Sequence, residues 1–154
     1  MNSRNLTNGV IGGLAGGAVF GIMMGMMGML PMIGKMVGQP TAIVGFGVHL
    51  VISAVIGLGF AVTLGRNVCG LGSGLRRGLL YGGSWWVLGP LTLMPFMMGM
   101  GLGVNWNAAA AVKMMPSLVG HLIYGAILGI TYARLAASQG SCAVKAPTKA
   151  TVSA

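Results

Sequence analysis

Two histidines are the residues of this sequence best suited to ligand or proton chemistry. His49 begins the stretch HLVISAVIG, and His121 begins HLIYGAILG, 72 residues further along the chain. An imidazole can ligate a haem iron or a metal ion, take up a proton near neutral pH, or hydrogen-bond to a neighbouring helix. The pair therefore admits three interpretations: structural hydrogen bonds, a pH-responsive pair, or a site for haem b or copper. Ser53, one helical turn after His49, is a further polar candidate.

Methionines form the second group with ligand chemistry. They are concentrated in residues 23–36 and 94–100, and Met114 and Met115 follow nearby. Thioether sulfur is a soft ligand that selects Cu(I), so these segments are candidates for a copper site. Methionine is equally a flexible apolar filler, and no Met and His share a short ligand motif. From the sequence we expect no resident cofactor, with haem b or copper as the alternative.

Acidic residues are absent, because the 154-residue chain has no Asp and no Glu. It therefore has no carboxylate side chain for general acid–base catalysis, for a Ser-His-Asp triad, or for a calcium or magnesium site. It also lacks a glycine-rich phosphate loop ending in Lys-Ser or Lys-Thr. The net charge of +9 is spread over loops and ends without a basic nucleic-acid-binding module. We predict a protein that is not an enzyme and does not bind nucleic acid.

The composition is typical of a membrane protein. Hydrophobic residues make up 55% of the chain and charged residues 6%, and the mean hydropathy is +0.87; a soluble domain has about 25% charged residues. The basic residues leave four uncharged windows, each able to hold the roughly 20 apolar residues that cross a bilayer. The sequence predicts an all-α, four-helix integral membrane bundle, with helices near 9–30, 42–64, 79–101 and 117–135. Pro90 and Pro95 predict a kink in the third helix.

Basic residues also predict the orientation of the chain. Two of them, Lys35 and Lys113, would lie on one side of the membrane. Seven would lie on the other side: Arg4, Arg66, Arg76, Arg77, Arg134, Lys145 and Lys149. The positive-inside rule then places both termini in the cytoplasm, with the protein in the plasma (inner) membrane and the basic side against anionic lipids. We expect a transmembrane domain over 1–136 and a disordered cytoplasmic tail over 137–154.

The sequence indicates an internal duplication. Besides the two histidine stretches, Gly9 and Gly13 have candidate counterparts in Gly78 and Gly82, and MLPM resembles LMPF. We predict two parallel two-helix repeats, over about 5–66 and 76–136. Two helices per unit would relate the copies by a pseudo-twofold axis along the membrane normal, as in some transporters.

Glycines recur at every fourth position on the first predicted helix, and small residues with one histidine keep the same spacing on the second and fourth. In lipid, small residues at this spacing let two helix backbones approach closely, and such packing drives helix association there. The positions predicted to pack helices are Gly9, Gly13, Gly17, Gly21, Gly25, Gly57, Gly125 and Gly129. The same ladders place each histidine toward a neighbouring helix. They serve contacts between chains as well as within one, so a homo-oligomer or a partner subunit in a membrane complex stays open.

The glycine-rich first segment, HLVISAVIG, GLLYGGSWWVLGPLTLMP and GHLIYGAILG occur in an order that resembles the YagU-like family of small bacterial inner-membrane proteins. The resemblance covers roughly residues 5–135. It implies a multi-pass inner-membrane protein with a loose link to acid resistance and no established activity. From the residues themselves we expect a small channel, a carrier-like scaffold or an accessory subunit. The alternative is a haem- or Cu(I)-binding membrane protein.

Overall fold

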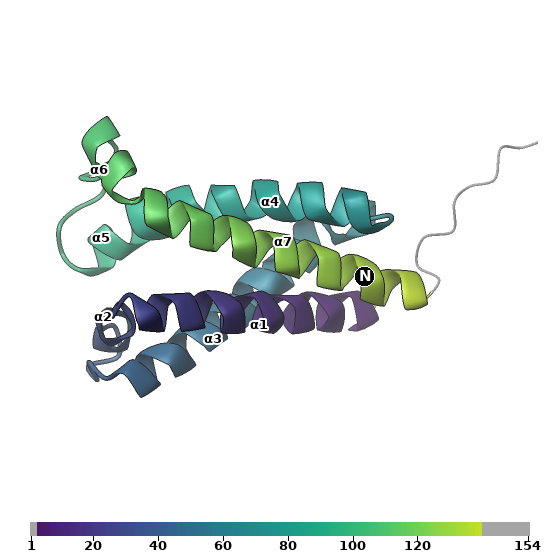
Figure 1. Ribbon diagram of the computed structural model, residues 1–154, viewed down its shortest axis with the longest axis horizontal. Helices are drawn as coiled ribbons and strands as arrows, with labels where there is room; N and C mark the ends of the chain where they lie inside the picture. The colour runs from purple at the N-terminus through teal and green to yellow at the C-terminus, as the bar shows by residue number, and fades with distance from the viewer. Residues whose placement is uncertain (1–2, 140–154) are drawn as a thin grey trace, which may run out of the picture.

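The computed structural model describes residues 3–139 and shows an all-α bundle (Figure 1). Most of the predicted tail, residues 140–154, lies outside the described residues. Within the described range, three helices are long and apolar enough to cross a membrane, namely α1, α3 and α7. In chain order the elements are α1 (Ser3–Met26), α2 (Leu30–Lys35), α3 (Ala42–Thr63), the 3₁₀ turn η1 (Gly65–Asn67), α4 (Leu71–Leu88), the π-helical turn η2 (Gly89–Leu93), α5 (Met94–Met97), α6 (Ala108–Lys113) and α7 (Met115–Ser138).

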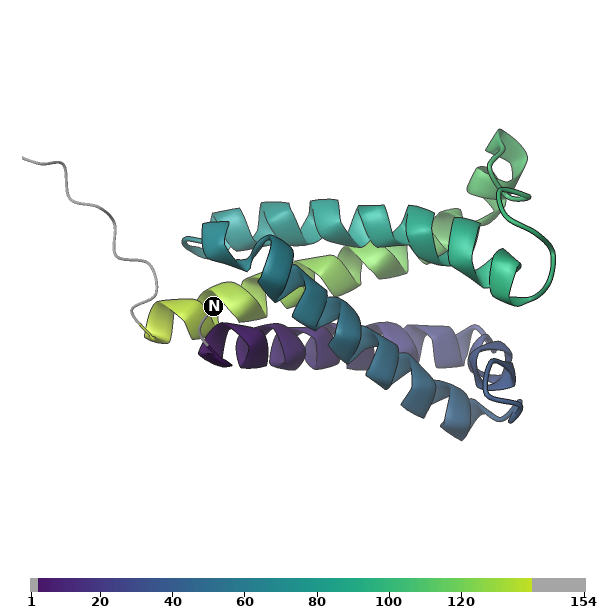
Figure 2. The same ribbon diagram turned by 180° about the vertical axis from the view of Figure 1, so that it is seen from behind.

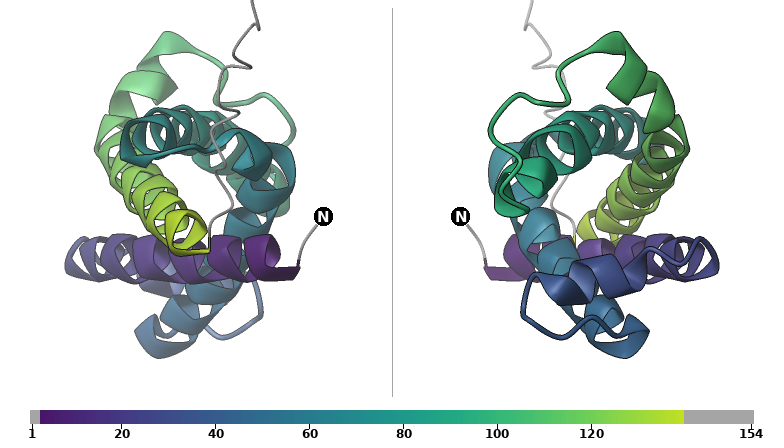
Figure 3. Two further views of the ribbon diagram at one scale, coloured as in Figure 1. Left: turned by 90° about the vertical axis from the view of Figure 1, so that its right-hand side faces the viewer. Right: turned by 90° about the vertical axis from the view of Figure 1, so that its left-hand side faces the viewer.

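The long helices form two packed pairs. α1 packs against α3, α4 packs against α7, and α1 also packs against α7, which joins the pairs. Seen from the side, α4 and α7 lie above α1 (Figure 1), and the end views show α3 running from beside α1 up to the level of α4 (Figure 3). α3 crosses α1 diagonally, and its start lies far from α4 (Figure 2). Near its other end α3 meets α4 through Tyr81, whose hydroxyl donates to the Ile56 carbonyl at 2.9 Å.

Glycines make the α1–α3 crossing close. A Cβ atom at Gly9 would lie 2.7 Å from the Cβ of Ala61, and one at Gly13 would lie 2.9 Å from the Cα of Gly57. Both separations are far inside van der Waals contact, so no larger residue fits without moving a helix. The predicted packing roles of Gly9, Gly13 and Gly57 agree with these contacts.

The α4–α7 crossing makes the same contacts with other residues. A Cβ at Gly74 would lie 2.8 Å from the Cβ of Ala133, and one at Gly78 would lie 3.1 Å from the Cα of Gly129. Ala133 follows Ala61 by 72 residues, in agreement with the predicted offset, but Gly74 follows Gly9 by 65. The counterpart of Gly9 is therefore Gly74 and not Gly78. The predicted match of the first helices is wrong by one helical turn.

A second glycine face of α1 packs against α7. A Cβ at Gly12 would lie 3.0 Å from the Leu128 carbonyl oxygen, and Gly16 similarly faces the Tyr124 carbonyl. The sequence interpretation missed both glycines because it considered one ladder. Gly25, in contrast, is exposed, and its Cβ would touch only the Leu30 side chain, at 3.3 Å, so it makes no backbone contact with another long helix of this chain.

The helices found at the first and third predicted spans differ from the prediction. α1 ends at Met26 instead of near residue 30, because Gly28 adopts a left-handed backbone (φ +69°) that ends the helix. The third segment is helical from Leu71 to Met97 but is interrupted by η2 at Gly89–Leu93. The predicted irregularity near Pro90 is thus present as a π-helical turn. α4 is not among the three helices that qualify as spans on length and hydropathy.

Charges are segregated along the bundle. Among the described residues, one end carries five arginines: Arg4, Arg66, Arg76, Arg77 and Arg134. We call this the basic end, and the end formed by α2, α5 and α6 the opposite end (Figure 1). Lys35 and Lys113 lie at the opposite end. Between the ends the surface is apolar, with Ile43, Val51 and Leu80 each about two-thirds exposed or more.

At the basic end, a pair of amides joins α1 to the end of α7. Asn8 is 2% exposed and exchanges two hydrogen bonds with Gln139, at 3.1 and 3.2 Å. We expect Asn8→Leu to lower the free energy of unfolding by about 1–3 kcal/mol, because it leaves the Gln139 amide unpaired. Unfolding in mixed micelles measures this effect. The double variant Asn8→Leu/Gln139→Leu should recover most of the loss, and no recovery would contradict the role of the pair.

Candidate functional site

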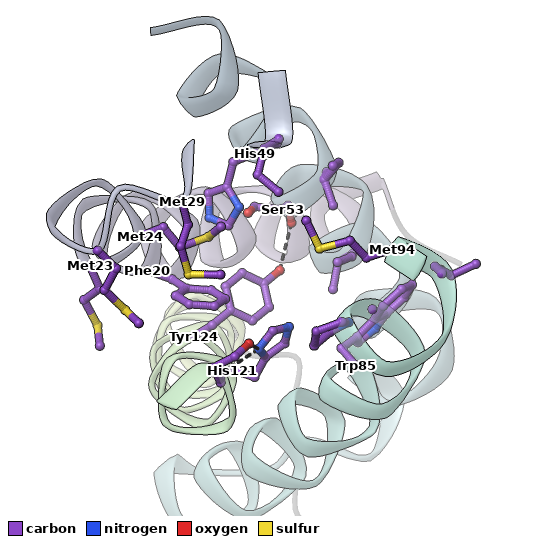
Figure 4. Close-up of a pocket in the computed structure, with 18 of the residues that line it drawn as sticks. Phe20, Met23, Met24, Met29, His49, Ser53, Trp85, Met94, His121 and Tyr124 are labelled. Atoms are coloured by element: carbon purple, nitrogen blue, oxygen red, sulfur yellow. Dashed lines mark hydrogen bonds between the residues drawn. The ribbon is translucent and has the colours of Figure 1, made fainter. Parts of the chain in front are cut away.

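A cavity of about 390 Å³ lies between the two helix pairs, toward the opposite end. Its walls come from α1, α2, α3, the α4–η2–α5 segment and α7, so every long helix contributes to it. Both predicted histidines line it, together with Ser53 (Figure 4). The rest of the lining is apolar or aromatic, apart from the polar groups of Ser117 and Tyr124.

His49 is held by the α1–α3 crossing. Its imidazole is 8% exposed, and Nε2 lies 3.1 Å from the carbonyl oxygen of Gly17 on α1. A carbonyl can only accept, so Nε2 carries the hydrogen and donates it. Gly17 has no side chain to block this approach. The structural hydrogen bond across the seam, one of the three interpretations, is therefore present at His49.

His121 has a different partner although it occupies the equivalent place on α7. Its Nδ1 donates to the Ser117 carbonyl of its own helix at 2.8 Å, and the Ser117 hydroxyl oxygen lies 3.4 Å away. Nε2 is then the nitrogen that carries the lone pair. A Cβ atom at Gly89 would lie 3.7 Å from this Nε2, so a glycine of the π-helical turn borders it. His121 thus offers a hydrogen-bond acceptor, or a metal ligand, at the cavity wall.

Aromatic rings separate the two imidazoles. The ring centroid of Phe20 lies 5.4 Å from that of His49 and 4.9 Å from that of His121, edge-on to both. Tyr124 donates a hydrogen bond from its hydroxyl to the Ser53 carbonyl at 2.8 Å. The rings of Phe20 and Tyr124 lie between the histidines (Figure 4). One iron or copper ion bound by both imidazoles does not fit this arrangement, so the haem alternative loses its proposed ligand pair.

Methionines from both predicted clusters line the same cavity. Two segments of the chain bring them together, the one that runs from the end of α1 to just past α2, and α5. The lining methionines are Met23, Met24, Met27, Met29, Met36, Met94 and Met97. Met114 and Met115, the other pair noted in the sequence, are not among the lining residues. Within residues 3–139 no group of three or more His, Cys, Asp or Glu side chains is placed to hold a metal ion.

Ser53 lies in the helix crossing as well as at the cavity. It is 2% exposed, and a Cβ at Gly17 would overlap its side chain. Its carbonyl accepts the Tyr124 hydrogen bond, which ties α7 to α3 across the cavity. Ser53 therefore contributes to the packing of three helices.

The sequence interpretation missed three aromatic cavity residues: Phe20, Trp85 and Tyr124. Two signals were available. Tyr124 follows His121 by three positions, so it lies on nearly the same helix face. Phe20 and Trp85 are 65 residues apart, the offset that also relates Gly9 to Gly74. They are therefore equivalent positions of the two pairs, but this is visible only once the glycine ladder is placed in its correct register.

Comparison of the chain with protein-family models, with curated proteins and with solved structures finds no match in any of the three. The resemblance to the YagU-like family stays a prediction from the sequence. The site must therefore be interpreted from its own geometry.

Proposed function

We propose that the protein is a non-catalytic, multi-pass membrane protein that holds an apolar small molecule in the cavity between its helix pairs, as a small carrier or as the binding subunit of a membrane complex. The observation that carries this proposal is the cavity itself. Its volume of about 390 Å³ falls within the roughly 300–1,000 Å³ of ordinary ligand sites. Its apolar wall with few polar groups is also typical of such sites.

The polar groups suggest the class of ligand. His121 Nε2 is an acceptor with no hydrogen of its own, so it pairs with a ligand that has a hydroxyl. The methionines around it are unbranched and adapt to irregular apolar shapes. A phenol or alcohol on a hydrocarbon body satisfies both features.

The proposal includes four membrane crossings, with α4, η2 and α5 together forming the third. A break in a spanning helix is tolerated where the backbone is buried in protein or lines a cavity, and η2 contributes Gly89, Pro90 and Leu93 to the cavity wall. The matched glycine crossings support an internal duplication with a pseudo-twofold axis. The basic end would face the cytoplasm of a bacterial inner membrane.

The test uses the detergent-solubilised full chain and two probes, 4-octylphenol and octylbenzene, which differ by one hydroxyl. We expect the protein to bind the phenol about three- to tenfold more tightly, because one neutral hydrogen bond contributes about 0.5–1.5 kcal/mol. The rise in Tm with probe concentration measures both affinities. His121→Phe should remove the preference while leaving octylbenzene binding unchanged.

Gly89→Val tests the cavity independently of the histidine. Its Cβ would lie 3.7 Å from His121 Nε2, in ordinary contact, and the rest of the side chain would occupy cavity volume, so both probes should bind more weakly. Gly47→Val is the matched control, because Gly47 is exposed on α3 and has no atom within 4 Å of its Cβ position. Equal binding by the two variants would contradict the proposed site.

Copper is the second candidate, because the lining thioethers and the lone pair of His121 Nε2 share one cavity. A titration with Cu(I) in the presence of a competing chelator distinguishes the copper site from the apolar-ligand site. Stoichiometric binding that is lost in Met94→Leu and kept in Met115→Leu would assign the cavity to soft-metal handling, since Met115 is about half exposed and lies outside the lining. Absence of stoichiometric binding would remove the copper alternative.

A further inference from the structure

Arg77 is a partly buried cation at the basic end of the bundle. It lies on α4, four residues before Tyr81, whose hydroxyl reaches the Ile56 carbonyl of α3. Residues four apart share a helix face, so Arg77 lies on the face of α4 that is turned toward α3. Its Nε is buried and has no hydrogen-bond partner, the one side-chain nitrogen or oxygen among residues 3–139 of which this is true.

The chain itself has no counter-charge to offer this side chain. Not one Asp or Glu occurs in the full sequence, and Nε of Arg77 has no hydrogen-bond partner among the described residues. Leaving the buried Nε donor without a partner costs about 1–3 kcal/mol. A partner for Arg77 must therefore come from outside the polypeptide side chains.

The chemistry of the guanidinium selects the kind of partner. Its planar set of donors matches the oxygens of a phosphate or carboxylate, and two parallel hydrogen bonds form at once. Arg66 is exposed at the same end and adds positive potential there. The long helices expose apolar side chains along their length, as expected for contact with lipid tails. The basic end, at the end of these helices, would then lie at the level of the lipid headgroups.

We infer that Arg77 is the centre of a binding site for a phosphate group, which an anionic lipid headgroup supplies between α4 and α3. Nε has almost no accessible surface in the described conformation, so the Arg77 side chain must turn outward before the phosphate oxygens accept from Nε and one terminal nitrogen. The site is separate from the cavity, which lies toward the opposite end. It does not depend on what the cavity binds.

The test uses the full chain in an uncharged detergent, titrated with dihexanoyl phosphatidylglycerol, dihexanoyl phosphatidylcholine or inorganic phosphate. Tm is followed in each titration, because a ligand that binds the native state raises it. We expect phosphatidylglycerol to raise Tm more than phosphatidylcholine. Arg77→Gln should weaken the apparent phosphatidylglycerol affinity by about tenfold, since a hydrogen bond to a charged group contributes about 1.5–3 kcal/mol.

Two further variants separate the site from general charge. Arg76→Gln makes the same change of charge on the adjacent, exposed residue, and should leave the lipid response close to that of the native chain. Arg77→Lys keeps the charge without the paired donors, and should fall between the native chain and Arg77→Gln. Such an intermediate response would show that the loss in Arg77→Gln comes from weaker phosphate binding and not from a folding defect.

The outcomes assign the source of the phosphate. A response to phosphatidylglycerol alone supports a lipid headgroup, and an equal response to inorganic phosphate supports the same anion site with a free ligand. Equal shifts with phosphatidylglycerol and phosphatidylcholine, or equal losses in Arg77→Gln and Arg76→Gln, would overturn the inference.

Discussion

Replacing Gly78 with isoleucine is expected to separate α4 from α7 and to lower the free energy of unfolding by about 3 kcal/mol or more. A Cβ at this position would meet the Gly125 carbonyl oxygen and lie 3.1 Å from the Cα of Gly129. Both obstacles are backbone atoms, which cannot rotate aside as a side chain can. Unfolding in mixed micelles, followed by circular dichroism, measures the loss.

Gly47 provides the matched control for this prediction. Gly47→Ile adds the same side chain in the interior of a long helix, but Gly47 is exposed and no atom lies within 4 Å of its Cβ position. Its stability should stay within about 0.5 kcal/mol of the native chain, as for most surface substitutions. If the two variants were equally stable, the close α4–α7 crossing would be incorrect.

The second prediction with a large effect concerns the side of the membrane from which two cysteine positions can be labelled. Cys69 is exposed in the segment before α4, and Val112 on α6 is 71% exposed. If the α4–η2–α5 segment crosses the membrane, these positions lie on opposite sides. In intact cells, a membrane-impermeant maleimide should then label Val112→Cys and not Cys69, an all-or-none difference. Mass spectrometry of the purified protein measures the modification.

The labelling experiment needs three controls. Cys142 is replaced by serine throughout, and Cys69 also by serine in the variants that test other positions. Val37→Cys, after α2, should be labelled like Val112→Cys, because both lie at the opposite end. Permeabilised cells should label all three positions. Labelling of Cys69 and Val112→Cys from the same side would mean three crossings, formed by α1, α3 and α7 alone.

The sequence predicted the second and fourth helices well, because the signals that define them lie within each helix and its flanks. α3 and α7 begin and end within three residues of their predicted bounds, because hydropathy and flanking charges act over single windows. The end of α1 was missed because it depends on one glycine, Gly28, in a segment with many glycines. The sequence does not show which of these adopts the left-handed conformation.

Register between the repeats could not be obtained from the glycines alone. A ladder with a step of four residues matches itself after a shift of one turn, so Gly78 and Gly74 were equally good counterparts of Gly9. The structure decides between them through Ala61 and Ala133, which meet Gly9 and Gly74 respectively. Tertiary contact supplied the information that a periodic sequence lacks.

The cavity was also beyond prediction, although its members were noted one by one. The two histidines and both methionine clusters are far apart in sequence, and the packing of the long helices brings them to one cavity. Phe20 illustrates the limit. Phe20 lies between His49 and His121 because α1 contacts both α3 and α7. Its ring keeps the two imidazoles from binding the same metal ion.

The unequal bonding of the two imidazoles has a consequence for any guest molecule. His49 uses its Nε2–H on the neighbouring helix, whereas His121 turns inward to its own helix and leaves Nε2 bare. The cavity therefore differs at its two histidines, although the two helix pairs that enclose it are similar. A molecule bound there could lie in two orientations, but only the one that turns a hydroxyl toward His121 Nε2 would form this hydrogen bond.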